Sequence, residues 1–336
     1  MLKIGVVGLG YLGEIHLKCL LGLKETYTIV GIFDVDTAKA RDLASRYELG
    51  VFETVEDLID ASDVVDIVTS TDAHFDIAQK AILADKHVFI EKPITSSLKE
   101  AEALLDLCKS RGVKIQVGHV ERFNPAFLAI RKKKLQPLFI EAHRLANYNP
   151  RGNDVSVIMD LMIHDLDLVL DLVKSKVSRV SASGTSVFQR SLDICNAQIE
   201  FENGCVANLS ASRVSLKNMR KLRFFQPDSY VSVDFLKKEV QWIDKVSVDT
   251  PTPEGMLAFD IDLESEAYKL QMVQTEVKDG NAIQMELSDF ANSIIAGTKE
   301  TVSIDDAVRA LDLADRIERS AMERLENYTN KLNKFK

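Results

Sequence analysis

Short, unbroken apolar runs alternate with segments of helical periodicity through about the first 120 residues. The runs are rich in β-branched residues, as in parallel strands that are covered on both faces. Strands that alternate with crossover helices predict βαβ units and a doubly wound parallel sheet. The predicted strands cover residues 3–7, 28–33, 64–69, 87–90 and 114–117, and the predicted helices cover 12–23, 37–47, 73–84 and 97–110.

The pattern changes after about residue 120. A polar loop at 147–154 leads into a long apolar helix at 157–173, and Asn203-Gly204 is a strong hairpin signal between two later strands. We therefore predict two domains, a Rossmann domain at 1–120 and an α+β domain at 121–336 with an open, mostly antiparallel sheet. Its other predicted helices are 125–134, 285–296 and 304–325, and its predicted strands are 138–146, 177–188, 193–202, 205–212, 221–225, 230–234 and 239–243.

A G-x-G-x-x-G run, from Gly8 to Gly13, follows the first predicted strand and opens the first predicted helix. In this context Gly8 allows a tight turn, Gly10 lets a pyrophosphate approach the backbone, and Gly13 lets the helix pack on the strand. Asp34 ends the second strand, where a carboxylate accepts hydrogen bonds from the adenosine ribose and repels a 2′-phosphate. The run predicts an NAD site; the alternative is a purely structural βαβ turn.

Two further strand ends carry a family likeness. A turn from Val68 to His74 follows the predicted strand at 64–69, and Glu91-Lys92-Pro93 follows the strand at 87–90. With the glycine run, these motifs resemble the Gfo/Idh/MocA family of sugar and cyclitol oxidoreductases. The resemblance implies that Lys92 lies beside the nicotinamide and substrate, where an ammonium can polarise an oxyanion; the alternative is a surface lysine before a turn-forming proline. The same resemblance extends the predicted cofactor site to Tyr11, Leu12, Ser70, Thr71, His74, Glu91, Lys92 and Pro93.

The apolar helix at 157–173 carries a polar stripe. Asp160, His164, Asp167 and Asp171 follow the spacing i, i+4, i+7, i+11, which places them on one helix face. Such a stripe must face water, a partner or a cleft, and we expect Asp171 to face solvent. Asp160 and His164 match the catalytic Asp-x-x-x-His motif of the family, which implies that His164 is a general base oriented by Asp160. The alternative is a satisfied buried pair.

Residues 118–125 and 154–165 resemble more specifically the UDP-N-acetylglucosamine 3-dehydrogenases of this family. That resemblance implies a nucleotide-sugar substrate, contacted by His164 and by residues where the chain passes between the domains. Arg144 and Arg151 flank the polar loop at 147–154 and are candidates for holding a diphosphate. The predicted substrate-binding residues are His119, Arg122, Asn124, Arg144, Arg151 and His164.

Composition narrows the possible partners. A formal charge of −9 argues against a nucleic-acid binder. No apolar run approaches the roughly 20 residues of a membrane helix. The 4 cysteines are scattered without metal-ligand spacing, which indicates a reducing compartment, and we expect a cytoplasmic protein without a metal. The family resemblance further implies a homodimer or homotetramer that associates through the C-terminal sheet.

The resulting hypothesis is reversible, NAD-dependent hydride transfer at a ring carbon of a sugar, with C3 of a UDP-N-acetylhexosamine as the expected position. One alternative is a dehydrogenase of a free cyclitol or monosaccharide, which would not require the two arginines. A second alternative is a regulatory protein that senses NAD without catalysis, because a fold does not imply a function. A metal-dependent hydro-lyase is disfavoured because Asp160 and His164 have no evident third ligand.

Overall fold

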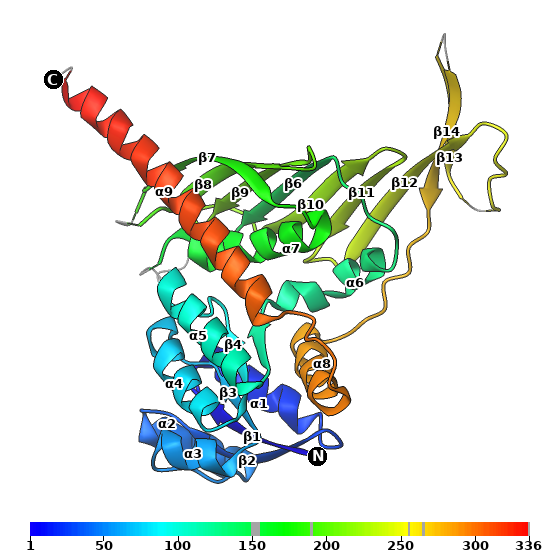
Figure 1. The fold of residues 1–336 in the computed structure, drawn as a ribbon. Helices are drawn as coiled ribbons and strands as arrows, with labels where there is room; N and C mark the ends of the chain where they lie inside the picture. The colour runs from blue at the N-terminus through cyan, green and yellow to red at the C-terminus, as the bar shows by residue number, and fades with distance from the viewer. Residues whose placement is uncertain (149–154, 189–190, 255, 264–265, 335–336) are drawn as a thin grey trace. The chain divides into compact units, whose positions relative to one another are not determined.

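The computed structural model describes residues 1–148, 155–188, 191–254, 256–263 and 266–334 (Figure 1). Its contacts divide the chain into two compact units. The first unit contains Met1–Phe123 and Asn281–Asp312, and the second contains Asn124–Gly280 and Leu313–Lys336.

The first unit is built on a parallel sheet of five strands in the order β2-β1-β3-β4-β5, which confirms the predicted doubly wound architecture. This order places a topological switch point between β1 and β3, where the carboxyl ends of the strands border a crevice. The strands are β1 (Leu2–Val7), β2 (Tyr27–Phe33), β3 (Val64–Ile67), β4 (His87–Glu91) and β5 (Ile115–Gly118). The helices are α1 (Tyr11–Leu21), α2 (Thr37–Tyr47), α3 (Val55–Ala61), α4 (Thr71–Leu83), α5 (Leu98–Arg111) and the 3₁₀ turn η1 (Val120–Phe123).

A later segment completes the core of this unit. Helix α8 (Ala282–Ala296) packs against α1, and it buries Leu287 and Phe290 in the cluster that contains Ile4 and Phe89. The Tyr27 hydroxyl donates a hydrogen bond to the Leu287 carbonyl at 2.9 Å. The sequence division at residue 120 placed residues 281–312 in the second domain, whereas the structure returns them to the first unit. Their apolar face fits a helix on any core, so only the tertiary contacts specify which core it covers.

The second unit contains a nine-stranded sheet in the order β13-β14-β12-β11-β10-β6-β9-β8-β7. All neighbours are antiparallel except β6 and β9, as expected for the mostly antiparallel sheet predicted from the sequence. The last two strands in the chain were not predicted. The strands are β6 (Phe139–Leu145), β7 (Val177–Thr185), β8 (Ile194–Phe201), β9 (Val206–Ser212), β10 (Met219–Gln226), β11 (Ser229–Asp234), β12 (Glu239–Ser247), β13 (Ala258–Leu263) and β14 (Glu266–Val273).

Side chains alternate between the two faces of this sheet. Ile140, Leu222 and Phe224 are fully buried on one face, whereas their neighbours His143 and Arg223 point to the other. The apolar face is covered by helices that include α6 (Pro125–Arg131) and α7 (Ile163–Val173), both of which lie along it in Figure 1. The last helix of the chain is α9 (Ile304–Lys334). In the described part of the chain, no helix combines the length and apolar character that a membrane span requires.

Candidate active site

The three glycines after β1 have different surroundings. Gly8 has a positive φ of 92°, and a Cβ there would lie 2.6 Å from the Thr69 backbone nitrogen. A Cβ on Gly13 would collide with the Gly8 carbonyl oxygen, so this glycine allows α1 to pack on the loop. A Cβ on Gly10 would meet nothing within 4 Å, so this side of the loop is open. The loop therefore leaves space beside its own backbone.

The Asp34 carboxylate fastens this loop to the end of β2. It accepts hydrogen bonds from the Leu9 backbone N–H at 2.6 Å and from the Asp36 backbone N–H at 2.8 Å. Helix α1 begins beside it without a side-chain cap, unlike α2 and α5, which are capped by Asp36 and Ser97. Uncapped first-turn N–H groups and the helix dipole favour an anion at this position.

A cavity of about 580 Å³ lies along the loop at the switch point. The predicted residues that line it are Gly8, Gly10, Tyr11, Leu12, Asp34, Ser70, Glu91 and Lys92. It is also lined by Val7, Phe33, Val35, Lys39, Val68, Thr69, Ala73 and Ile77, which the sequence reasoning did not select. Val7, Phe33, Val35, Val68 and Thr69 lie at or just after the ends of β1, β2 and β3, a position that could have indicated them, whereas Lys39, Ala73 and Ile77 lie on α2 and α4.

The residues present fit a dinucleotide. The open side of Gly10 and the uncapped start of α1 would accept a pyrophosphate, and Asp34 would accept the adenosine ribose hydroxyls. Lys92, which directly follows β4, lines the same cavity. The cavity volume also lies within the usual range for a small-molecule site.

The other predicted cofactor residues, Gly13, Thr71, His74 and Pro93, are not among the residues that line the cavity. His74 is buried, and its Nδ1 and Nε2 lie 3.0 Å from the Pro93 carbonyl and 3.2 Å from the Thr69 carbonyl. It thereby connects the turns that follow β3 and β4. Burial lowers the pKa of His74, which favours the neutral ring, and a neutral ring donates to only one of these carbonyls.

The predicted catalytic pair lies where a helix changes its type. Asp160 belongs to a π-helical segment, Ile158–Met162, and His164 is in the first turn of α7. Both side chains are partly exposed, whereas Met162 and Ile163 between them are buried. Single π turns inside helices recur at functional sites.

The expected polar stripe does not continue along α7. Asp167 is buried, and Asp171, which the sequence placed in solvent, forms an ion pair with Arg131 at 3.2 Å and is only 10% exposed. The prediction for Asp171 was therefore wrong. Asp167 and Asp171 lie in α7, beyond the π segment, where the helix packs within the second unit and Arg131 at the end of α6 supplies a partner for Asp171.

Arg144 makes a contact that its position in the sequence did not indicate. Its Nε and Nη2 donate to Asp165 Oδ2 and Oδ1 at 2.9 and 2.8 Å, and both side chains are almost completely buried. The pair joins β6 to the first turn of α7, next to His164. Its geometry gives Arg144 a different task from the predicted diphosphate contact.

Three other predicted substrate residues are buried or form hydrogen bonds within the protein. His119 and Arg122 are buried, and Arg122 donates to the Thr301 carbonyl at 3.5 Å. Asn124 caps α6 by accepting from the Ala126 N–H at 3.1 Å. Arg151 lies outside the described residues.

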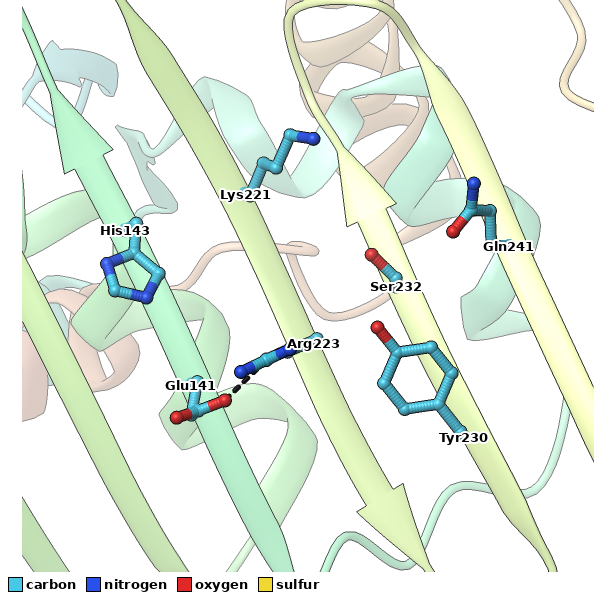
Figure 2. A pocket seen from close by; sticks show the side chains of 7 residues that line it. All are labelled: Glu141, His143, Lys221, Arg223, Tyr230, Ser232 and Gln241. Carbon is cyan, nitrogen blue, oxygen red and sulfur yellow. Dashed lines mark hydrogen bonds and ion pairs between the residues drawn. The ribbon is translucent and has the colours of Figure 1, made fainter.

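A second hollow, of about 400 Å³, lies on the polar face of the nine-stranded sheet (Figure 2). Arg223 on β10 forms an ion pair with Glu141 on β6, and Lys221 and His143 form the next cross-strand pair. Tyr230, Ser232 and Gln241 complete its lining. This hollow contains none of the predicted site residues. Among the described residues, no group of three histidines, cysteines or acids has a metal-binding arrangement.

Comparison with known proteins agrees with this picture. Residues 2–119 match the Gfo/Idh/MocA oxidoreductase family, NAD-binding Rossmann fold, and residues 136–225 match the Gfo/Idh/MocA C-terminal domain. The chain is 34% identical to UDP-N-acetylglucosamine 3-dehydrogenase of Acidithiobacillus ferrooxidans over 88% of this chain and 89% of that protein. It is 30% identical to scyllo-inositol 2-dehydrogenase (NAD(+)) of Bacillus subtilis over 63% and 68% of the two chains.

A solved structure of the Acidithiobacillus ferrooxidans enzyme superposes with a TM-score of 0.84 at 32% identity, covering 95% of this chain and 97% of that chain. The fold and the cavity define a two-unit oxidoreductase that uses NAD. The chain belongs to the Gfo/Idh/MocA oxidoreductase family, as the resemblance in its sequence motifs predicted.

Proposed function

We propose that the protein is an NAD-dependent dehydrogenase that oxidises a ring hydroxyl of a nucleotide sugar, with C3 of a UDP-N-acetylhexosamine as the reacting position. The observation that carries this proposal is the similarity to the Acidithiobacillus ferrooxidans enzyme over nearly the full length of both chains. The partly exposed Asp160 and His164 support it, because a sugar hydroxyl needs a general base.

In this reaction the bound NAD supplies the hydride acceptor. His164 accepts the proton of the hydroxyl that is oxidised, and loss of this proton and of the ring hydride leaves a carbonyl. Asp160 orients the imidazole, and the Lys92 ammonium holds the reacting oxygen as negative charge develops on it. The buried Arg144–Asp165 pair supports His164 by holding the start of α7 on β6.

For the nucleotide part of the substrate we assign Arg151 to the diphosphate. A guanidinium binds phosphate oxygens through paired, charge-assisted hydrogen bonds. This contact is remote from the reacting carbon, so its loss should raise KM more than it lowers kcat. One such contact contributes about 1.5–3 kcal/mol, so R151A should raise KM about ten- to a hundredfold.

The test measures NADH formation with UDP-N-acetylglucosamine, UDP-glucose and myo-inositol as substrates. Wild type and R151A are compared with R179A, which removes an exposed arginine on β7 and should not change KM. Turnover of UDP-N-acetylglucosamine, with a raised KM in R151A alone, supports the proposal. Turnover of myo-inositol without turnover of the nucleotide sugars overturns it. Equal KM values in all three proteins overturn only the role of Arg151.

A second candidate is a dehydrogenase of a free cyclitol, which the 30% identity to the scyllo-inositol enzyme favours. A neutral cyclitol needs no diphosphate contact, so the myo-inositol assay separates the two candidates. A protein that binds NADH tightly but oxidises none of these compounds would instead be an NAD sensor.

We also propose that copies of the chain associate through the polar face of the nine-stranded sheet as a homodimer or homotetramer. The exposed Phe225 and the row of charged side chains in Figure 2 support this face as the contact. Light scattering after size exclusion tests it by comparing R223E, which places a second acid beside Glu141, with R179E on the edge strand β7. A monomeric wild type contradicts this part of the proposal.

A further inference from the structure

A buried histidine connects the helix that follows the glycine loop to the ends of two strands. His16 lies in α1, and its side chain is completely buried. Its Nδ1 is 3.0 Å from Oδ2 of Asp66 on β3, and its Nε2 is 3.3 Å from Oε1 of Glu91 on β4. The ring also meets Phe89 edge-on. One imidazole therefore joins three elements of the first unit beneath the cofactor cavity.

The charge of this cluster follows from its geometry. A neutral imidazole carries one N–H, so the ring can direct an N–H toward each of the two carboxyl groups only when it is an imidazolium. Burial lowers the pKa of His16, but the carboxyl groups of Asp66 and Glu91 reverse this effect, and the pKa lies well above its ordinary value. Burial raises the pKa of Glu91, but the interactions with His16 and Lys92 together outweigh this effect and hold the pKa below its ordinary value.

Glu91 transmits this constraint to the next residue. Its Oε2 accepts a hydrogen bond from the Lys92 backbone N–H at 3.1 Å. On another side, a Cβ on Gly118 would lie 2.6 Å from Oε1, so the carboxylate occupies space that this glycine leaves free. Glu91 and Lys92 both line the cofactor cavity. The chain of contacts thus runs from His16 through Glu91 to the backbone of Lys92.

A metal site does not explain these residues. The two carboxyl groups lie at opposite edges of the imidazole, because one faces Nδ1 and the other faces Nε2. They therefore share no point with the ring at which an ion could be bound by all three residues.

We propose that His16 is a positioning residue, which holds Glu91 and thereby fixes the backbone from which Lys92 reaches the reacting oxygen. This inference rests on the role of Lys92 in the proposed function. A catalytic group displaced by about 1 Å can lose about a hundredfold in rate. His16 therefore acts on kcat through Lys92, without contact with NAD or the sugar.

The first test compares kcat, the KM for NAD and thermal stability in wild type, H16Q and E300Q. The control E300Q breaks the Lys114–Glu300 ion pair, which measures 2.8 Å and lies in the same unit away from the cavity. We expect H16Q to lose at least tenfold in kcat with a KM for NAD within twofold of wild type. E300Q should lose stability without losing kcat. An unchanged kcat in H16Q, or an equal loss of kcat in both variants, overturns the proposal.

A second measurement does not depend on activity. Hydrogen–deuterium exchange of the peptide that contains Lys92 should be faster in H16Q, because the acceptor of its N–H is no longer held, while exchange in β1 stays the same. If wild type oxidises no sugar, the proposed function fails, but this exchange still decides the role of His16. Unchanged exchange at Lys92 overturns the role.

If H16Q does not fold, the variants E91Q and E91A test the proposal instead. The amide of E91Q still offers an oxygen to the Lys92 N–H and an N–H to His16 Nε2, so E91Q should lose less kcat than E91A. E91A offers neither and should lose at least tenfold. Equal kcat in E91A and wild type overturns the proposal.

Discussion

Arg144 and Asp165 form a two-pronged ion pair between β6 and α7, with N–O distances of 2.9 and 2.8 Å. Only 3% and 4% of the two side chains is exposed, so removal of either partner leaves a buried charge. We expect R144A to lower the free energy of unfolding by about 3–5 kcal/mol. Urea unfolding measures this loss, with R179A as the exposed control. Wild-type stability in R144A, together with a raised KM for the nucleotide sugar, would instead support a diphosphate contact.

Asp34 should determine which dinucleotide binds. Its carboxylate lines the cavity and would accept ribose hydrogen bonds, and it would repel the 2′-phosphate of NADP. The nearby Lys39, which also lines the cavity, would then face this phosphate without opposition. We expect D34S to reduce the preference for NAD about ten- to a hundredfold, as loss of a charge-assisted hydrogen bond predicts. Fluorescence titrations with NADH and NADPH measure it. Equal affinities in the wild type would contradict this role.

His164 should control turnover without controlling cofactor affinity. As the proposed general base, its replacement in H164A should lower kcat by about 10²–10⁴. The dissociation constant for NADH should stay close to that of wild type, because the cofactor cavity lies in the other unit. The matched control is H143A, which removes an exposed histidine from the polar face of the sheet. Full turnover in H164A would remove this residue from the mechanism.

The cluster around His16 should make stability depend on pH in two directions. The pKa of His16 is raised in the folded protein, so its contribution is complete below 6.5, its ordinary value, and is lost as pH rises through the folded pKa. The pKa of Glu91 is lowered, so its contribution is complete above 4.5 and is lost as pH falls through the folded pKa.

Urea unfolding at a series of pH values should therefore show greatest stability between these limits. In H16Q the decline on the alkaline side should become shallower, because the titrating imidazole is gone. An equally steep alkaline decline in wild type and H16Q would mean that His16 does not contribute to it.

The sequence was sufficient to predict a helix or strand wherever the element's own periodicity and end signals define it. The runs that became β1 to β5 are apolar on both faces, and the capping box of Ser97 and Glu100 marks the start of α5. The glycine spacing likewise indicated the cofactor loop, because a Cβ on Gly13 would collide with the carbonyl of Gly8 in the same loop. The strand β13 did carry such a signal, because Phe259-Asp-Ile-Asp-Leu263 alternates apolar and charged residues, but the sequence prediction overlooked it.

The sequence by itself determined the parallel sheet, the dinucleotide loop and the family motifs, because these depend on residues close together in the chain. Only the tertiary structure decided that Arg144 pairs with Asp165, that Asp171 meets Arg131, and that His16 lies between Asp66 and Glu91. Each of these charges could have been solvated or paired elsewhere. Its partner comes from a distant element, and the fold buries at least one group of each pair, so that leaving this group without a partner would be costly.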